Sequence, residues 1–202
     1  MKDMLFYERQ AAEGGLRIAG MDEAGRGPLA GPVVVAAVVM PLSSDKLISG
    51  VDDSKKLSEK KREALYEQIM QVAEEVQVAF ATHEEVDSLN VLNATKKAML
   101  QCVNSLTKAD KVLIDAVTLS AKIPTLGIIH GDALSYSIAA ASIVAKVTRD
   151  RLMKQYDRQY PLYNFAKHKG YGTAEHIRLL GQYGACPIHR KTFIKKFVTE
   201  EQ

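Results

Sequence analysis

The sequence contains no apolar run of the roughly 18–20 residues that a membrane-spanning helix requires. Its first residues, MKDMLFYERQ, carry both charge signs and lack the apolar core of a signal peptide. These absences argue against an integral membrane protein and against a secreted one. We therefore expect a cytoplasmic protein that works without a membrane.

Cysteine is scarce. Cys102 and Cys186 are the two cysteines, and they lie too far apart in the chain to suggest a disulfide framework. No set of cysteines and histidines has convincing zinc spacing, since Cys186 and His189 in CPIH form a lone pair. We interpret both cysteines as ordinary reduced side chains.

Internal repeats and low-complexity tracts are also lacking. The 202 residues, 47% of them hydrophobic, are enough for a substantial core. A chain of this length forms either one large domain or a domain with an appendage.

Acidic residues are few in the last quarter of the chain. Residues 146–198 contain 12 Lys and Arg against 3 Asp and Glu, whereas residues 1–145 contain 15 against 19. A basic segment on a mildly acidic body indicates either a polyanionic partner or a merely soluble lysine-rich surface. Charge alone leaves both interpretations open.

Five apolar runs rich in β-branched residues predict buried strands. They are LRIAGM (16–21), PVVVAAVVM (32–40), VQVAFAT (76–82), KVLIDA (111–116) and LGIIHG (126–131).

Helices are predicted between and after these strands. Ser58 can cap a helix, with Glu59 in its first turn, and Thr82 and Glu85 have the spacing of a capping box. Leu65, Ile69 and Val72 share one helix face, and further helices are predicted over 90–106, 137–158 and, capped by Thr173, 173–183. This order predicts an α/β fold, a mixed five-stranded sheet flanked by helices with a helical C-terminal extension.

Four acidic residues lie at or just past the ends of predicted strands, namely Asp22, Glu23, Asp115 and Asp132. Buried charges are usually paired or bound to a metal, so converging carboxylates either share protons or hold hard cations. All-oxygen ligands favour magnesium or manganese. Two such ions, about 4 Å apart, can activate a water and stabilise a leaving oxygen in phosphoester hydrolysis.

The stretch MDEAGRGPLAGP raises a geometric difficulty. Asp22 and Glu23 are neighbours, and neighbours on an ideal strand point to opposite faces. They reach one site only if the backbone turns there, as Gly25 permits; otherwise they form a solvated edge. Gly25, Arg26 and Gly27 are either a turn with an exposed arginine, or a backbone brought close to a ligand with Arg26 on a phosphate.

Six blocks, in order, resemble the bacterial type 2 ribonucleases H, the ribonuclease HII family, over roughly residues 16–194. The blocks are IAGMDEAGRGPLAGPVV, DSKKLSEKKREALY, LNVLNAT, VLIDA, GDALSYSIAAASIVAKVTRD and HKGYGTAEH. The first block and AAASIVAKVTRD are specific even alone. The resemblance implies the ribonuclease H-like fold.

The resemblance also implies the activity. Similar enzymes cut the RNA of RNA–DNA hybrids and incise 5′ of single ribonucleotides in duplex DNA, leaving 3′-hydroxyl and 5′-phosphate ends. They serve in ribonucleotide and RNA primer removal. We expect a monomer with a single domain over residues 1–202, comprising a catalytic core at about 16–158 and a helical C-terminal segment at about 159–198.

The resemblance assigns roles to particular residues. By similarity, Asp22, Glu23 and Asp115 would bind divalent metal, Mn²⁺ or Mg²⁺, and Asp132 would be the fourth active-site carboxylate of the metal and catalytic set. Tyr171 matches the tyrosine that packs on the sugar of the following deoxynucleotide, the alternative being a core tyrosine.

Substrate recognition is implied in the same way. Gly25, Arg26 and Gly27 match the family's GRG, whose backbone reads the 2′-hydroxyl that distinguishes RNA from DNA. The basic residues expected at the substrate are Lys55, Lys56, Lys146, Arg149, Lys167, His168 and Lys169. For the first four of these, structural salt bridges are the open alternative to phosphate contacts.

Two residues depart from the family pattern. Many relatives have lysine in place of His130, and relatives often have glycine in place of Ala116.

Three alternative identities predict different sequence features. A type 3 ribonuclease H carries an extra N-terminal domain and lacks GRG, a type 1 enzyme lacks DEAGRG, and a non-catalytic hybrid-binding module predicts a missing carboxylate. About 15 residues precede the first predicted strand, and all four carboxylates are present.

Overall fold

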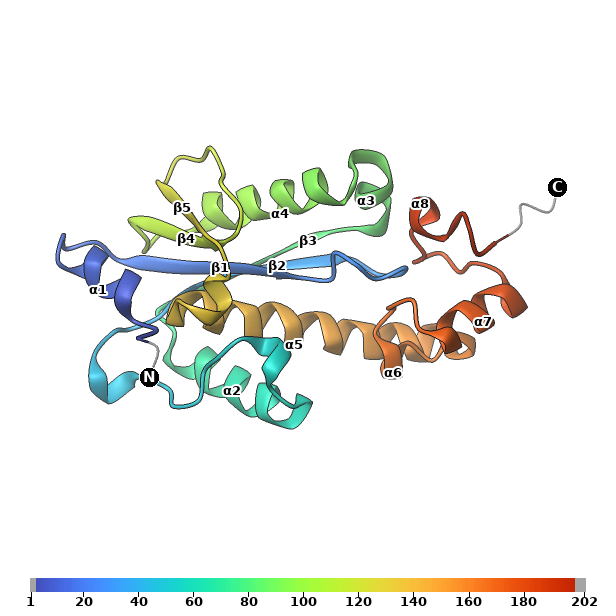
Figure 1. Cartoon of the computed structure of the whole chain (residues 1–202), viewed down its shortest axis with the longest axis horizontal. Helices are drawn as coiled ribbons and strands as arrows, with labels where there is room; N and C mark the ends of the chain where they lie inside the picture. The colour runs from blue at the N-terminus through green and yellow to red at the C-terminus, as the bar shows by residue number, and fades with distance from the viewer. Residues whose placement is uncertain (1–2, 199–202) are drawn as a thin grey trace.

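The computed structural model describes residues 3–198 and is built around one mixed five-stranded sheet (Figure 1). The strands are β1 (Ile18–Ala24), β2 (Val33–Val39), β3 (Glu75–Ala81), β4 (Lys111–Asp115) and β5 (Thr125–Ile128). They lie in the order β3-β2-β1-β4-β5. β1–β2 and β2–β3 are antiparallel, whereas β1–β4 and β4–β5 are parallel. All five predicted strands, and the predicted fold class, are confirmed.

Helices surround this sheet. They are α1 (Phe6–Ala12), α2 (Glu59–Val72), α3 (His83–Leu89), α4 (Val91–Ser105), α5 (Tyr136–Gln159), α6 (Phe165–His168), α7 (Ala174–Tyr183) and α8 (Lys191–Ile194). Short 3₁₀ turns are η1 (Ser44–Lys46), η2 (Ser54–Lys56), η3 (Gly131–Ala133) and η4 (Pro161–Tyr163). No helix within residues 3–198 is both long and apolar enough to cross a membrane.

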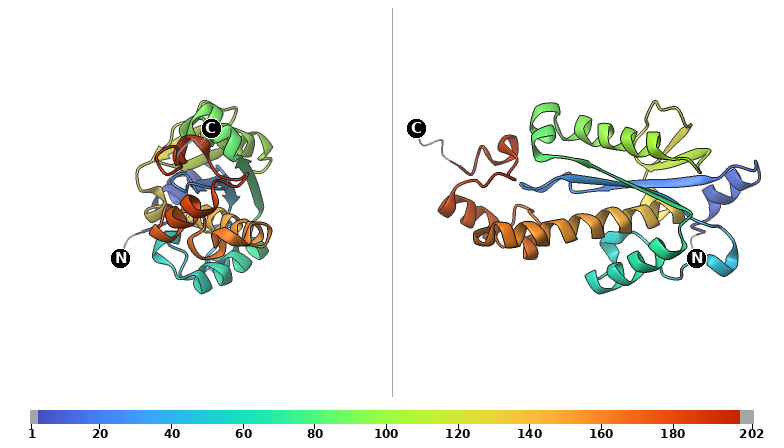
Figure 2. Two further views of the ribbon diagram at one scale, coloured as in Figure 1. Left: turned by 90° about the vertical axis from the view of Figure 1, so that its right-hand side faces the viewer. Right: turned by 180° about the vertical axis from the view of Figure 1, so that it is seen from behind.

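Two apolar layers explain the unbroken hydrophobic run of β2, whose seven residues are all buried. One layer lies between the sheet and α4, and the other between the sheet and the helices α2 and α5. Figure 2 shows α5 extending along the underside of the sheet, opposite α4. A strand covered on both faces has no solvent side, so it lacks polar alternation.

The predicted helix caps are confirmed. Ser58 and Thr173 accept main-chain N–H groups at the starts of α2 and α7. Thr82 and Glu85 form the complete capping box of α3. The predicted helix over residues 90–106 begins just after Asn90, which caps it.

The N-terminal helix α1 was not predicted, because it has seven residues and no side-chain cap. It is anchored by Glu8, which is fully buried. The Oε1 atom of Glu8 accepts hydrogen bonds from Ser135 Oγ (2.5 Å) and from the main-chain N–H of Ser137 (2.9 Å). This contact ties α1 to the start of α5.

Close packing of α5 on β1 depends on Gly20. A Cβ atom at this position would lie 2.0 Å from the main-chain carbon of Ser137. The helix therefore approaches the strand through a site that only glycine can fill. This approach sets the start of α5, and the η3 turn before it, beside the end of β1.

Candidate active site

The predicted carboxylates gather where β1 extends beyond β4. The parallel pairing of the two strands ends at Met21 and Ile114, and Asp22, Glu23 and Asp115 follow at once. These three side chains line one cavity of about 230 Å³. The carboxylates of two neighbouring parallel strands thus meet at one edge of the sheet.

The backbone does not turn between Asp22 and Glu23. The expectation that these two side chains need a turn to reach one site is therefore wrong. β1 keeps regular pairing with β2 through both residues and through Ala24. The Oδ1 atom of Asp22 accepts the main-chain N–H of Glu23 at 2.7 Å, which folds the Asp22 side chain along the strand. The chain turns only at Gly25, whose φ is +100°.

Asp132 joins this group from the η3 turn and is buried. The Oδ1 atom of Asp115 accepts the main-chain N–H of Gly131 at 2.7 Å, which fastens the turn to the end of β4. The Nζ atom of Lys55, on η2, lies 3.0 Å from Asp132 Oδ2. The structure therefore brings together all four predicted carboxylates, with Lys55 paired to Asp132.

Burial and mutual repulsion disfavour the charged forms of these groups. Burial, and then the charges of Glu23 and Asp115, raise the pKa of Asp22 well above its ordinary value. Burial raises the pKa of Glu23, although the Arg26 guanidinium opposes the shift. Burial also raises the pKa of Asp115, against a hydrogen bond from Gly131 and with a further contribution from the charge of Asp132. Such a cluster gains stability from added positive charge.

The side chains fit a divalent cation by their chemistry. All the donors are carboxylate oxygens, which hard cations prefer. Glu23 Oε2 is buried and has no hydrogen-bond partner within residues 3–198, while Glu23 Oε1 lies 3.3 Å from Arg26 Nη1. Nevertheless, no three Asp, Glu, His or Cys side chains among the described residues are already arranged to hold a metal ion. Lys55 and Arg26 occupy carboxylate oxygens instead.

The same cavity contains the glycine-arginine-glycine loop. Gly25, Arg26 and Gly27 line it together with Asp22 and Glu23. A Cβ atom on Gly27 would lie 3.9 Å from the Tyr171 ring, so the loop and the tyrosine are neighbours.

Tyr171 lies at the cavity and is 43% exposed, so the core alternative for this tyrosine is wrong. Lys146 Nζ and Arg149 Cζ each lie 5.9 Å from its ring centroid. Its main-chain N–H donates to the carbonyl of His168 at 2.9 Å. An exposed ring on a fixed backbone can stack on a sugar or base.

Four of the seven predicted basic residues divide into two pairs. Lys55 and Lys146 line the cavity, and Lys146 also pairs with Asp150 at 2.7 Å. Lys56 and Lys167 are exposed, pair with Asp52 and Glu175 respectively, and do not line that cavity.

Three predicted substrate contacts are contradicted by burial. Arg149 is fully buried and donates to the main-chain carbonyls of Ala30, Pro32 and Lys169. His168 is buried, with Nε2 against the carbonyl of Tyr163 and Nδ1 accepting the N–H of Gly170. Lys169 is buried and donates to the Ala166 carbonyl. A phosphate has no access to these groups, and they hold the main chain instead.

Two residues at the site were missed by the sequence argument. Ser54 lines the cavity, and Arg190 lies beneath the glycine-arginine-glycine loop, with hydrogen bonds to Gly25 and Arg26. Arg190 sits in the stretch CPIHRK, where it looks like one more surface cation. Its burial depends on contacts more than 150 residues away in sequence, so no local pattern could reveal it.

The departures at positions 116 and 130 share a backbone feature. Ala116 and His130 both have positive φ angles, +50° and +58°, just after β4 and just before η3. Left-handed backbone favours glycine, which explains why glycine suits position 116.

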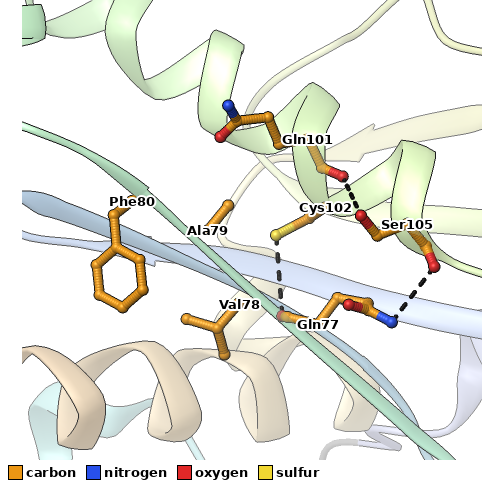
Figure 3. Close-up of a pocket in the computed structure, with 7 residues that line it drawn as sticks. All are labelled: Gln77, Val78, Ala79, Phe80, Gln101, Cys102 and Ser105. Atoms are coloured by element: carbon orange, nitrogen blue, oxygen red, sulfur yellow. Dashed lines mark hydrogen bonds between the residues drawn. The ribbon is translucent and has the colours of Figure 1, made fainter.

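Another cavity, between β3 and α4, lacks the chemistry of the first (Figure 3). Its seven lining residues include no acidic or basic side chain. The thiol of Cys102 points toward the carbonyl of Gln77, and burial raises the pKa of this thiol to about 12. The thiol is therefore unreactive at neutral pH.

Comparison with known proteins identifies the family of the chain. The sequence pattern of the family described as ribonuclease HII matches residues 19–196. The ribonuclease HII of Ruminiclostridium cellulolyticum is 53% identical over 201 residues, which cover 98% of this chain and 78% of that protein. The ribonuclease HII of Bacillus licheniformis is 54% identical over 192 residues, covering 94% of this chain and 74% of that protein.

Solved structures share the fold. The crystal structure of the ribonuclease H2 from Pyrococcus horikoshii superposes with a TM-score of 0.74 at 29% sequence identity, and covers 90% of this chain and 97% of that one. Ribonuclease HII in its PCNA complex from Archaeoglobus fulgidus gives a TM-score of 0.77 at 24% identity, over 92% of this chain and 97% of that one.

Proposed function

The chain belongs to the ribonuclease HII family, and we propose that its four carboxylates and its glycine-arginine-glycine loop cut and select the substrate from one cavity. As a member, it is an endonuclease of the ribonuclease H class, a phosphodiester hydrolase that acts on RNA–DNA hybrids. Beyond this, we propose incision 5′ of single ribonucleotides in duplex DNA, for ribonucleotide and RNA primer removal. The products would carry 3′-hydroxyl and 5′-phosphate ends.

Asp22, Glu23, Asp115 and Asp132 would hold the divalent metal, Mg²⁺ or Mn²⁺. Bound divalent ions in such a site activate a water and stabilise charge on the leaving oxygen. The raised pKa values of Asp22, Glu23 and Asp115 support this assignment, because a cation relieves the repulsion that raises them. On binding, Lys55 and Arg26 would leave Asp132 and Glu23 and be free to contact phosphate oxygens.

The loop from Gly25 to Gly27 would place its main chain against the 2′-hydroxyl beside the scissile phosphate. The absence of a Cβ atom at Gly27, beside the Tyr171 ring, leaves room for a close backbone approach. Tyr171 would pack on the sugar of the following deoxynucleotide. Lys146, at 5.9 Å from that ring, is available to the same strand.

One observation carries the proposal. A single cavity is lined by Asp22, Glu23 and Asp115 together with Gly27 and Tyr171. A scissile phosphate at the carboxylates therefore brings the adjacent sugar to the loop. We further propose that the chain works as one domain, since C-terminal Arg190 contacts Gly25, the residue that follows β1.

Cleavage of duplex DNA with one embedded ribonucleotide, in Mg²⁺, in Mn²⁺ and in EDTA, tests this function. We expect cutting at the 5′ side of the ribonucleotide with either metal and none in EDTA. A duplex without the ribonucleotide is the control and should stay intact. Tight binding without cutting in either metal would favour the hybrid-binding module.

A further inference from the structure

Arg190 is a charged side chain in an unusual position. It is 0% exposed, and within residues 3–198 its guanidinium donates only to main-chain carbonyls. The acceptors are Gly25 O (2.6 Å from Nη2), Arg26 O (2.9 Å from Nη1) and Gly31 O, which lies 3.0 Å from Nε and 2.8 Å from Nη2.

A buried charge without a carboxylate needs these bonds. Burial, and then the neighbouring Arg149 guanidinium, lower the pKa of Arg190 to about 9, which leaves it charged at neutral pH. Removing such a cation from water is unfavourable unless dipoles are aimed at it. The three carbonyls supply those dipoles, so the loop must keep them turned inward.

Arg149 holds the same loop from a second side. It donates to the carbonyls of Pro32 (2.9 Å) and Ala30 (3.1 Å), and a Cβ atom on Gly25 would lie 2.0 Å from its Nε atom. The main chain of Arg190 also donates to the carbonyl of Leu29 at 2.8 Å. Two guanidiniums from separate elements thus clamp residues 25–32.

The geometry of the peptide bond determines where the N–H groups of this loop point. The described backbone contains no cis peptide bonds. In a planar trans peptide, the C=O of one residue and the N–H of the next point in opposite directions. When Gly25 O and Arg26 O face the guanidinium, the N–H groups of Arg26 and Gly27 point away from it.

We propose that Arg190 is a positioning residue for substrate selection, because it fixes the peptide planes through which residues 25–27 meet the ribonucleotide. This inference rests on the proposed function, in which that loop reads the 2′-hydroxyl. Arg190 touches no substrate. It acts by presenting the N–H groups of Arg26 and Gly27, two hydrogen-bond donors for the hydroxyl oxygen.

The test compares Arg190→Lys, which keeps the charge but not the fork of donors, with Arg190→Met, which keeps the bulk alone. The control is Arg178→Met, since Arg178 is an exposed arginine that donates to Gln182 on α7. Affinity is measured in Ca²⁺ for duplex DNA with one ribonucleotide and for the same duplex without it. Thermal melts of all variants accompany the measurement.

We expect the preference of the wild type for the ribonucleotide duplex to fall about 10-fold in both Arg190 variants. Affinity for the all-DNA duplex should stay within about twofold. Arg178→Met should change neither affinity. A general loss of structure would weaken both affinities together and would not change their ratio.

Other outcomes overturn the proposal. If both Arg190 variants keep the wild-type preference, only the role of Arg190 is rejected, and the proposed role of residues 25–27 is not affected. A wild type without any preference would reject the reading role of residues 25–27, and the inference with it. If neither Arg190 variant melts cooperatively, Arg190 serves folding rather than selection.

Discussion

Two regions at the cavity, the carboxylate cluster and the glycine-arginine-glycine loop, differ in the contacts that stabilise them. The carboxylate cluster (Asp22, Glu23, Asp115 and Asp132) carries like charges. The pKa values of Asp22, Glu23 and Asp115 are raised, and Glu23 Oε2 has no hydrogen-bond partner within the described residues. The glycine-arginine-glycine loop (residues 25–27) has its Gly25 and Arg26 carbonyls bound to the buried guanidinium of Arg190. We therefore expect an added cation to stabilise the cluster, whereas the main chain of the loop is held by contacts within the protein.

The largest expected effect separates cutting from folding. Asp115→Asn should lower kcat by at least about 1,000-fold, because several kcal/mol of metal-derived stabilisation are lost. The melting temperature should not fall, since a half-buried like charge has been removed. Asp45→Asn, at an exposed position on η1, is the control and should keep full activity. An Asp115→Asn enzyme with normal turnover would contradict the metal assignment.

The next effect concerns selection. Tyr171→Ala should reduce kcat/KM by about 10-fold at a lone ribonucleotide, the size expected for a lost stacking contact. Long RNA–DNA hybrid offers many sites and should suffer less. Tyr171→Phe keeps the ring and should retain most of the activity. Equal losses on the two substrates would show that the tyrosine does not read the junction.

The melting temperature of carboxylate variants tests the repulsion within the cluster without any substrate. In EDTA at pH 7, Asp22→Asn should raise the melting temperature, and each kcal/mol gained appears as roughly 2–4 °C in a chain of this size. The pKa of Asp22 is raised in the folded state, so its ionisation costs stability as pH rises through that value. The gain should therefore vanish as pH falls below 3.8, the ordinary pKa of the group.

In the loop, the Gly25→Ala change is the matched comparison. Gly25 has φ +100° and no room for a Cβ atom, so this variant should lose stability at every pH. A gain in Gly25→Ala, or a loss in Asp22→Asn at pH 7, would reverse the comparison.

The smallest effect lies at the end of β4. Ala116→Gly should stabilise the protein by about 0.5–1 kcal/mol, because Ala116 has a φ of +50°. Ala73→Gly is the control, since Ala73 has a φ of −58° and gains nothing from glycine. Chemical denaturation of both variants measures the difference, and a loss of stability in Ala116→Gly would contradict the strain at this position.

The sequence predicted the sheet well because its signals are local. The uninterrupted β-branched run of β2 and the Thr82–Glu85 capping box are read from adjacent residues. The four carboxylates were predicted from strand ends, for the same reason. The contact that orients the Asp22 side chain was not predicted. Asp22 Oδ1 accepts the main-chain N–H of Glu23, and the backbone does not turn between the two residues.

The basic residues show where local signals fail. Arg149 and Arg190 look like surface cations in sequence, yet both are fully buried. Their hydrogen-bond partners are main-chain carbonyls. Because every residue has a carbonyl, the residue types do not indicate which of them will bind these arginines. The packing of α5 and of the C-terminal segment against residues 25–32 creates these contacts.

Equilibrium binding by the Asp115→Asn protein tests the central contrast most directly. The protein is titrated with duplex DNA containing one ribonucleotide, and with the same duplex lacking it. If the glycine-arginine-glycine loop is fixed independently of the carboxylate cluster, the Asp115→Asn protein keeps the wild-type preference for the ribonucleotide. If the preference disappears together with cutting, the loop and the carboxylate cluster depend on each other, and the proposal that the loop is fixed independently is wrong.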